Sequence, residues 1–285
     1  MSKYIIFAFH LVLQGAILVK MSEDRESLFK LGQQYFSGDG IPRDLKAALD
    51  CFKRSAELEF APAQFQLGLA HDPTGLARTY GISGDSTVAF QWYLKAAEQG
   101  NRGSMKMVAM GFQMGIHGAP QDRGKAVEWY AKLVQFDDTY AMMQLGLIAI
   151  DGKQMETGAE WLEAAAELGD PLALSLYRSY VKAGVLPALD AQKELALLES
   201  AAEKGDVEAM LARGLKCEKG EGVPVDLPKA YALLTLVSIS EDAKARPGKA
   251  SEGIARIKKK MGVNELKIAD ELFEAMHRKL SQLLD

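Results

Sequence analysis

A short phrase that occurs twice is the feature that most constrains what this chain can fold into. "SGDGIPRDLKAA" covers residues 37–48, and "KGEGVPVDLPKA" covers residues 219–230. Both contain glycines two positions apart, then an aliphatic residue, a proline, an aspartate and a lysine-alanine pair. Glycine and proline set where helices end, so the phrase indicates backbone turns rather than chemistry. Its recurrence predicts an array of equivalent units.

Further copies of the unit appear when the chain is aligned on a three-residue pattern. The pattern starts with a small residue, and one helical turn later an apolar residue and a second small residue follow. Five copies have a glycine at the same later position, and the second copy has Thr74 with Gly75 beside it. A helix of about three turns ends most easily at glycine, which adopts the left-handed backbone without steric cost. The first helix of each unit is therefore predicted to end at these glycines: Gly38, Gly115, Gly152, Gly184 and Gly220.

A second helix is predicted to follow the turn in each unit. Pro42, Pro120 and Pro224 lie a few residues beyond the glycines, where proline cannot prolong a helix. The aspartates that follow can accept hydrogen bonds from the free amides of the next helix. Apolar residues then recur at helical spacing. The second helices are expected to start at Asp44, Asp122 and Asp226 and to end near Gly100, Gly169 and Gly205.

A helix pair this short cannot bury its apolar side alone, so neighbouring pairs must stack. The predicted fold is all-α, a right-handed superhelix of about six helix pairs. Small residues are expected at close helix contacts: Gly32, Gly68, Gly146, Ala47 and Ala126. The predicted repeats are residues 27–62, 63–103, 104–140, 141–172, 173–208 and 209–240. Residues 1–26 form an extension, and residues 241–285 a helical cap with an apolar stripe of Leu266, Ala269, Leu272, Phe273, Met276, Leu280 and Leu284.

The combined pattern, LGxxYxxGxG(I/V)PxDxxKAxxWYxKAAxxG, resembles the Sel-one-like repeat (SLR) family, a relative of the tetratricopeptide repeats. The likeness is carried by residues 31–57, 88–100, 124–133, 158–169, 197–205 and 219–230. It implies an α-solenoid with an adaptor, scaffold or regulatory role, often in bacteria. The second copy has an insertion around "HDPTGLARTYG" and the fifth lacks the turn signature, so these copies are expected to deviate.

Composition argues against several classes of function. The net charge of −4 and the pI near 5.7 provide no basic field for nucleic acid. Cys51 and Cys217 lack metal-ligand spacing, which favours free, buried thiols over a long-range disulfide. The histidines form no metal pair and lie in no catalytic motif: His10, His71, His117 and His277. We therefore expect no enzyme activity, no cofactor and no metal, and we expect the basic run at residues 256–260 to be a solvated helix face.

The first twenty residues are mostly apolar and could be a secretory signal. His10 and Gln14 interrupt the apolar run, and no small-residue cleavage pattern follows it. The segment is also too short for an integral membrane span. Met21 then begins a stretch typical of a cytosolic start, so translation from Met21 and a cytoplasmic location are favoured over a periplasmic or secreted protein.

The resemblance also implies a partner-binding groove, since in tetratricopeptide units the first helices line the concave surface. Alignment of the copies gives a candidate lining: Phe29, Gln33, Phe65, Leu69, Lys106, Met110, Met143, Leu147, Ser175, Ser179, Leu211 and Leu215. Adaptable methionine side chains suit a groove that receives a peptide or helix. The other interpretation, that these residues pack between neighbouring units, stays open.

The resulting hypothesis is a non-enzymatic scaffold or adaptor that binds a protein or peptide in its groove. A first alternative is an immunity or inhibitor protein that neutralises a bacterial effector enzyme, as some SLR proteins do. A second alternative is a member that binds or hydrolyses cell-wall-type ligands. Such members are rich in cysteine, and two cysteines in six repeats count against this alternative.

Overall fold

The computed structural model describes residues 24–240 and 248–284. The predictions about residues 1–20 lie outside the described residues. Throughout the described part of the chain the regular structure is α-helical, with no strand, which confirms the all-α prediction. The chain consists of two compact units, unit 1 (Met1–Phe136) and unit 2 (Asp137–Asp285).

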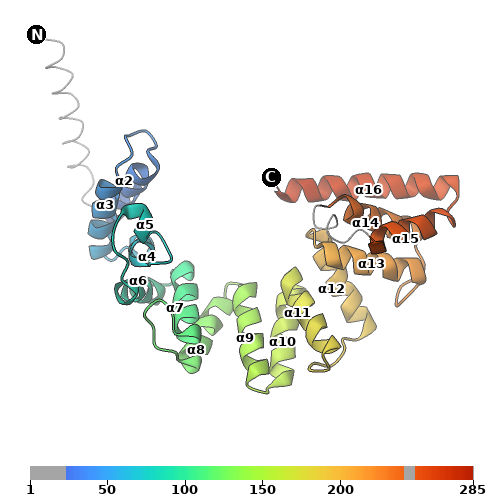
Figure 1. Cartoon of the computed structure of the whole chain (residues 1–285), viewed down its shortest axis with the longest axis horizontal. Coiled ribbons are helices and arrows are strands. Elements are labelled where there is room, and N and C mark those ends of the chain that lie inside the picture. The colour runs from blue at the N-terminus through green and yellow to red at the C-terminus, as the bar shows by residue number, and fades with distance from the viewer. Residues whose placement is uncertain (1–23, 241–247, 285) are drawn as a thin grey trace, which may run out of the picture. The chain divides into compact units, whose positions relative to one another are not determined.

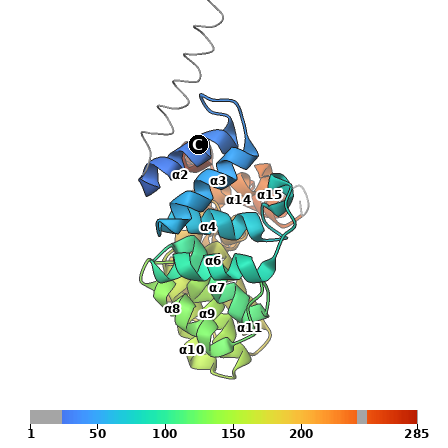
Figure 2. The same cartoon turned by 90° about the vertical axis from the view of Figure 1, so that its left-hand side faces the viewer.

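Unit 1 consists of three helix pairs and one short extra helix. Apart from the short extra helix, each helix contacts the next along the chain, as the successive helices between residues 25 and 98 show (Figure 2). The pairs are α2 (Arg25–Ser37) with α3 (Leu45–Glu57), α4 (Ala61–His71) with α6 (Ser86–Glu98), and α7 (Arg102–Met114) with α8 (Arg123–Val134). The insertion in the second copy forms α5 (Ala77–Tyr80) between α4 and α6.

Unit 2 also contains three helix pairs, followed by two further helices (Figure 1). The pairs are α9 (Thr139–Asp151) with α10 (Met155–Glu167), α11 (Pro171–Lys182) with α12 (Ala191–Glu203), and α13 (Val207–Lys219) with α14 (Leu227–Ile239). α15 (Gly248–Lys258) and α16 (Val263–Leu284) both pack on α14. The repeat solenoid is thus present in the helix pairs, whereas the right-handed superhelix and the repeat boundaries stay predictions.

The helix ends follow the aspartate and glycine pattern of the sequence. The carboxylate of Asp44 accepts hydrogen bonds from two amides at the start of α3, and Asp226 caps α14 in the same way through one amide. At the other end of a first helix, Gly38 has a left-handed φ of 80°. In the fourth copy α9 ends at Gly152 as predicted, but Gly152 has a φ of −75° and Lys153 takes the left-handed conformation at 61°. The turn there is displaced by one residue because the amides of both residues bond back into α9.

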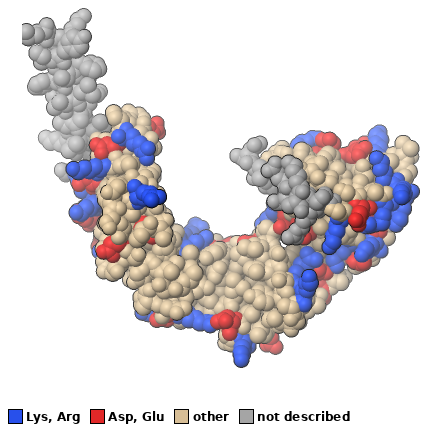
Figure 3. Space-filling model, viewed as in Figure 1, with Lys and Arg blue, Asp and Glu red and all other residues tan. Residues whose placement is uncertain are grey.

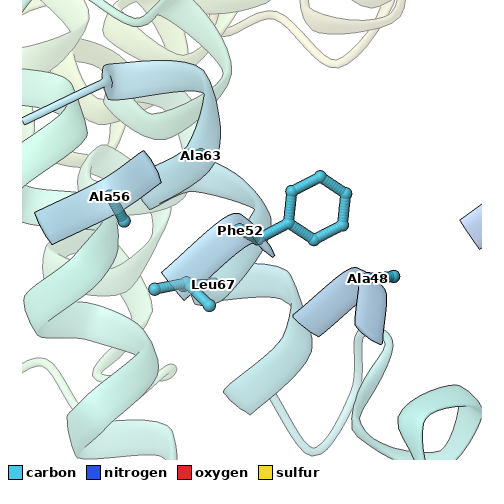
Figure 4. Close-up of a cluster of buried hydrophobic side chains, with 5 residues drawn as sticks. All are labelled: Ala48, Phe52, Ala56, Ala63 and Leu67. Atoms are coloured by element: carbon cyan, nitrogen blue, oxygen red, sulfur yellow. The ribbon is translucent and has the colours of Figure 1, made fainter. Parts of the chain in front are cut away.

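Small residues of first helices lie against large side chains of second helices. A Cβ atom on Gly68 would lie 2.4 Å from Cδ1 of Tyr93, and one on Gly32 would lie 2.7 Å from Cε1 of Phe52. The close contacts predicted at Gly32 and Gly68 are therefore confirmed, and Gly146 and Ala126 are buried as well. Around Phe52 the core of unit 1 contains Ala48, Ala56, Ala63 and Leu67 (Figure 4).

The fifth copy lacks the glycine-proline turn and uses side chains to hold its loop. Leu186 is buried in the loop between α11 and α12. The hydroxyl of Tyr177 on α11 donates to the carbonyl of Pro187, 3.1 Å away. A buried leucine and a tyrosine hydrogen bond thus stabilise a connection that the repeat signature does not specify.

The C-terminal helices carry a mixed charge on their surface. Lys258, Lys259 and Lys260 are exposed, as expected for a solvated face, while Arg256 also pairs with the buried Glu218 at 2.8 Å. Figure 3 shows acidic and basic residues interspersed over α15 and α16, while the surface around α9 is mostly uncharged in this view.

Within residues 24–240 and 248–284, no helix combines the length and the apolar character that crossing a membrane requires.

Candidate functional site

The aromatic candidates of unit 1 take part in packing between helices. The ring of Phe29 lies 5.5 Å from that of Phe52 and 5.4 Å from that of Phe60. The ring of Phe65 lies 5.9 Å from that of Tyr93. Phe29 and Phe65 are only half-buried, so each combines a packing role with a solvent-accessible edge.

The remaining candidates of unit 1 keep more of their surface free. Gln33 on α2 is exposed. Leu69 on α4 and Met110 on α7 are half-buried, as is Lys106, one turn before Met110. Unit 1 therefore presents apolar side chains at equivalent positions of two first helices, with a polar residue on a third.

In unit 2 one candidate differs from the others. Met143 is only 5% exposed, because α9 is apolar around most of its circumference and buries this face as well. Met143 is thus a core residue, as the packing interpretation has it. Accessible surface remains at the other five candidates: Leu147, Leu211 and Leu215 are half-buried, and Ser175 and Ser179 are exposed.

Most other methionines of the first helices also belong to the core. Met105, Met142 and Met210 are between 4% and 7% exposed. Met114, at the end of α7, is 50% exposed. A continuous methionine-lined groove is therefore absent from the described first helices, and the accessible apolar positions are mainly leucines.

A buried polar cluster in unit 1 was missed by the sequence analysis. Asp72, 1% exposed, lies directly after α4. Its Oδ2 atom is 2.8 Å from Nδ1 of His117 and 3.2 Å from the hydroxyl of Tyr93. Its Oδ1 atom accepts from the amide and the hydroxyl of Thr74. His117 lies in the loop after α7, so the cluster joins the loops of the second and third copies.

The contacts of Asp72 determine the protonation of its carboxyl group. Burial by itself raises the pKa, but the hydrogen bonds from Thr74, the neighbouring His117 and the Tyr93 hydroxyl outweigh it, so the pKa is lowered overall. The carboxylate is therefore the stable form in the folded chain. One signal could have indicated the cluster: Asp72 and His117 both lie in turns that follow first helices of adjacent copies, and equivalent turns of stacked repeats lie close together.

The cluster connects the loops of two neighbouring copies and has a structural role. His117 has a φ of 54°, and a Cβ atom on the adjacent Gly118 would lie 2.5 Å from the carbonyl oxygen of Ser86. The loop is thus pressed against the start of α6 while its histidine pairs with Asp72. In the part of the chain that the structure describes, no group of three or more His, Cys, Asp or Glu side chains could hold a metal ion.

The two cysteines are free and buried, Cys51 in α3 and Cys217 in α13. Burial raises the pKa of both thiols, which disfavours the reactive thiolate. Both residues therefore behave as small apolar core residues.

Comparison with known proteins identifies the repeat. The family model described as Sel1 repeat matches residues 25–60, 61–101, 104–134, 139–170 and 207–236. The fifth copy, with its different loop, is not among the matched segments.

The proteins similar to this chain include one curated relative and two solved structures. Cytochrome c oxidase assembly factor 7A of Xenopus laevis is 32% identical over 116 residues, which is 39% of this chain and 48% of that protein. The chain therefore spans about half the length of this relative. A Sel1 repeat protein from Oxalobacter formigenes has a TM-score of 0.62 and 27% identity, covering 82% of this chain and 66% of that one. A protective antigen of uropathogenic Escherichia coli with an SLR fold has a TM-score of 0.61 and 24% identity, covering 92% and 56%.

Proposed function

This chain belongs to the Sel1 repeat family, and from that premise we propose that it is a non-enzymatic scaffold that binds a partner protein or peptide through its first helices. Sel1 repeats commonly mediate protein interactions, and a stack of helix pairs offers an extended surface for this purpose.

A single observation carries the proposal: apolar side chains stay accessible at equivalent positions of first helices. In unit 1 these are Leu69 and Met110, and in unit 2 they are Leu147 and Leu215, with Leu211 about one helical turn before Leu215. Accessible apolar side chains with polar residues around them are compatible with a surface that another chain covers. Each unit thus has accessible apolar side chains on its own first helices.

The curated relative agrees with this proposal. That relative is named an assembly factor, a name that is compatible with a role in binding other proteins. The similarity covers less than half of either chain, so the proposal takes from it only the general role of a protein that binds proteins.

The test is a pair of charge substitutions on first helices with matched controls on second helices. Leu147→Glu and Leu211→Glu place a charge on the proposed surface. Ala131→Glu on α8 and Ala196→Glu on α12 place the same charge on exposed positions of second helices. Each variant is used as bait in a native lysate of the source organism, bound proteins are quantified by mass spectrometry, and thermal unfolding is followed by circular dichroism.

We expect the first-helix variants to lose a protein that the wild type and the controls both retain, with little change in melting temperature. Met143→Glu serves as a folding control, because a charge at this buried position should unfold unit 2. Equal capture by the wild type and the first-helix variants, with unchanged folding, would contradict the proposed surface.

A further inference from the structure

A cavity in unit 2 lies between the last helix pairs and the C-terminal helix. It has a volume of about 130 Å³ and is formed by residues of α12, α13, α14 and α16. Most of its wall is apolar, and this part consists of Ala202, Met210, Leu233, Leu236, Met276 and Leu280. A cavity of this size accommodates a single aliphatic side chain.

A buried arginine lines the cavity and is incompletely paired. Arg213 on α13 is 7% exposed, and its Nη2 atom donates to Oε2 of Glu199 at 3.2 Å. Its Nε and Nη1 atoms are buried and have no hydrogen-bond partner among the described residues. Buried donors without acceptors are strongly disfavoured, most of all on a charged group. The guanidinium therefore has a strong physical requirement for a further acceptor.

The charges around the cavity do not balance. Glu199 is shared between two cations, since its Oε1 atom also accepts from Nζ of Lys229 at 2.7 Å. At the rim, Lys279 and Glu203 lie 3.3 Å apart, and these two exposed charges offset each other. One positive charge of the Arg213–Lys229 pair is therefore left without a counter-charge among the residues that line the cavity.

We propose that this cavity binds the C-terminal carboxylate of a peptide whose last side chain is apolar. A carboxylate matches the planar fork of a guanidinium and carries the single negative charge that the cavity lacks. A phosphate would bring close to two negative charges and no apolar group for the leucine and methionine wall. The inference rests on the proposed scaffold function and narrows the chemistry of the partner that unit 2 receives.

Arg213 and Lys229 have separate roles in this site. Arg213 provides the unpaired donors at the apolar wall. Lys229 also binds Glu199, so the carboxylate of Glu199 is shared and leaves donors of the Arg213 guanidinium without an acceptor. The apolar side chain of the last peptide residue packs against Leu233 and Leu236 of α14 and Met276 of α16. The helix that ends the array thus becomes one wall of a ligand site.

The proposal is tested by calorimetric titration of the full chain with three small ligands. The first is an N-acetylated tetrapeptide that ends in leucine with a free carboxylate. The second is the same peptide as its C-terminal amide, and the third is N-acetyl-leucine. We expect the peptide acid to bind at least tenfold more tightly than the amide, the ratio that one charge-assisted hydrogen bond supplies, and more tightly than N-acetyl-leucine.

Substitutions connect the binding to the cavity. Arg213→Met keeps the length of the side chain and removes the donors, so it should reduce the affinity for the peptide acid to that for the amide. Lys229→Met should weaken the same affinity, and it provides a second variant should Arg213→Met fail to fold. Lys216→Met is the matched control, because Lys216 also lies on α13 but pairs with Glu194 and does not line this cavity. Its affinity should equal that of the wild type.

Equal affinity for the acid and the amide, or no binding of either, would overturn the proposal. If N-acetyl-leucine bound as tightly as the peptide acid, the cavity would be a site for a small carboxylic acid. This result would overturn the proposal that the carboxylate comes from a peptide. Unchanged affinity in both Arg213→Met and Lys229→Met would place the carboxylate elsewhere. These failures are distinguishable from a failure of the scaffold function, because capture through Leu147 and Leu211 is measured independently.

Discussion

Nδ1 of His117 lies 2.8 Å from Oδ2 of Asp72, and the two residues belong to loops of neighbouring repeats. Both side chains are at least nine-tenths buried. Stacked repeats are usually described by their apolar contacts, whereas the second and third copies of this chain also share a buried contact between a carboxylate and an imidazole.

Asp72→Asn should destabilise unit 1 by about 1–3 kcal/mol, because it replaces a buried carboxylate that accepts hydrogen bonds from Thr74 and Tyr93. Urea unfolding monitored by circular dichroism measures the change. Asp39→Asn is the control, since Asp39 is an exposed aspartate in the equivalent loop of the first copy. A loss no larger for Asp72→Asn than for Asp39→Asn would show that the pair contributes nothing.

The contribution of Asp72 to stability should depend on pH. Its folded-state pKa is lowered from an ordinary value of 3.8. The stabilisation is therefore fully present above the unfolded-state pKa and is lost as pH falls through the folded-state pKa. The difference in unfolding free energy between the wild type and Asp72→Asn should shrink as the pH falls from about 5 to below 3.8. A difference that stays constant over this range would argue against a lowered pKa.

Removal of a tyrosine hydroxyl should have opposite effects at two positions of unit 1. The Tyr93 hydroxyl donates to Asp72, so Tyr93→Phe should lower the unfolding free energy by about 1–2 kcal/mol. The Tyr80 hydroxyl is buried without a partner in the described residues, and burial raises the pKa of Tyr80 to about 12. Tyr80→Phe should therefore be neutral or stabilising by up to about 1 kcal/mol. Equal losses in the two variants would refute this distinction.

A methyl group at the contact between α4 and α6 should be poorly tolerated. Gly68→Ala would place its Cβ atom 2.4 Å from Tyr93, and we expect it to lower the unfolding free energy by about 1–3 kcal/mol. Gly124→Ala is the matched control on α8, where the nearest atom is 3.5 Å away and alanine favours the helix by about 1 kcal/mol. If Gly68→Ala left the melting temperature unchanged, the two helices would not pack as closely as described.

The helix pairs were predictable from the sequence because their ends depend on local chemistry. Asp44 caps its own helix and Gly38 ends its own helix, so neither depends on distant residues. The exception at Gly152 and Lys153 arose because the hydrogen bonds at the end of α9 shift the turn by one residue, which the glycine alone does not reveal.

The candidate site was less predictable because it depends on how helix faces and loops meet. Met143 lies on a helix that is apolar on nearly every side, so periodicity could not show which face is buried. The pairing of Asp72 with His117 depends on the path of the insertion in the second copy. Arg213 and Glu199 come from different repeats, and only their packing shows that the guanidinium keeps unpaired donors.

Site-specific photo-crosslinking in cells of the source organism tests the central claim most directly. A photoreactive phenylalanine is introduced at Leu69 and Leu147 on first helices, and at Ala131 and Ala196 on second helices. Covalent adducts with another protein at the first two positions, and none at the last two, are the predicted result. Adducts confined to the second-helix positions, or none at any of the four in correctly folded protein, would contradict a partner-binding surface on the first helices.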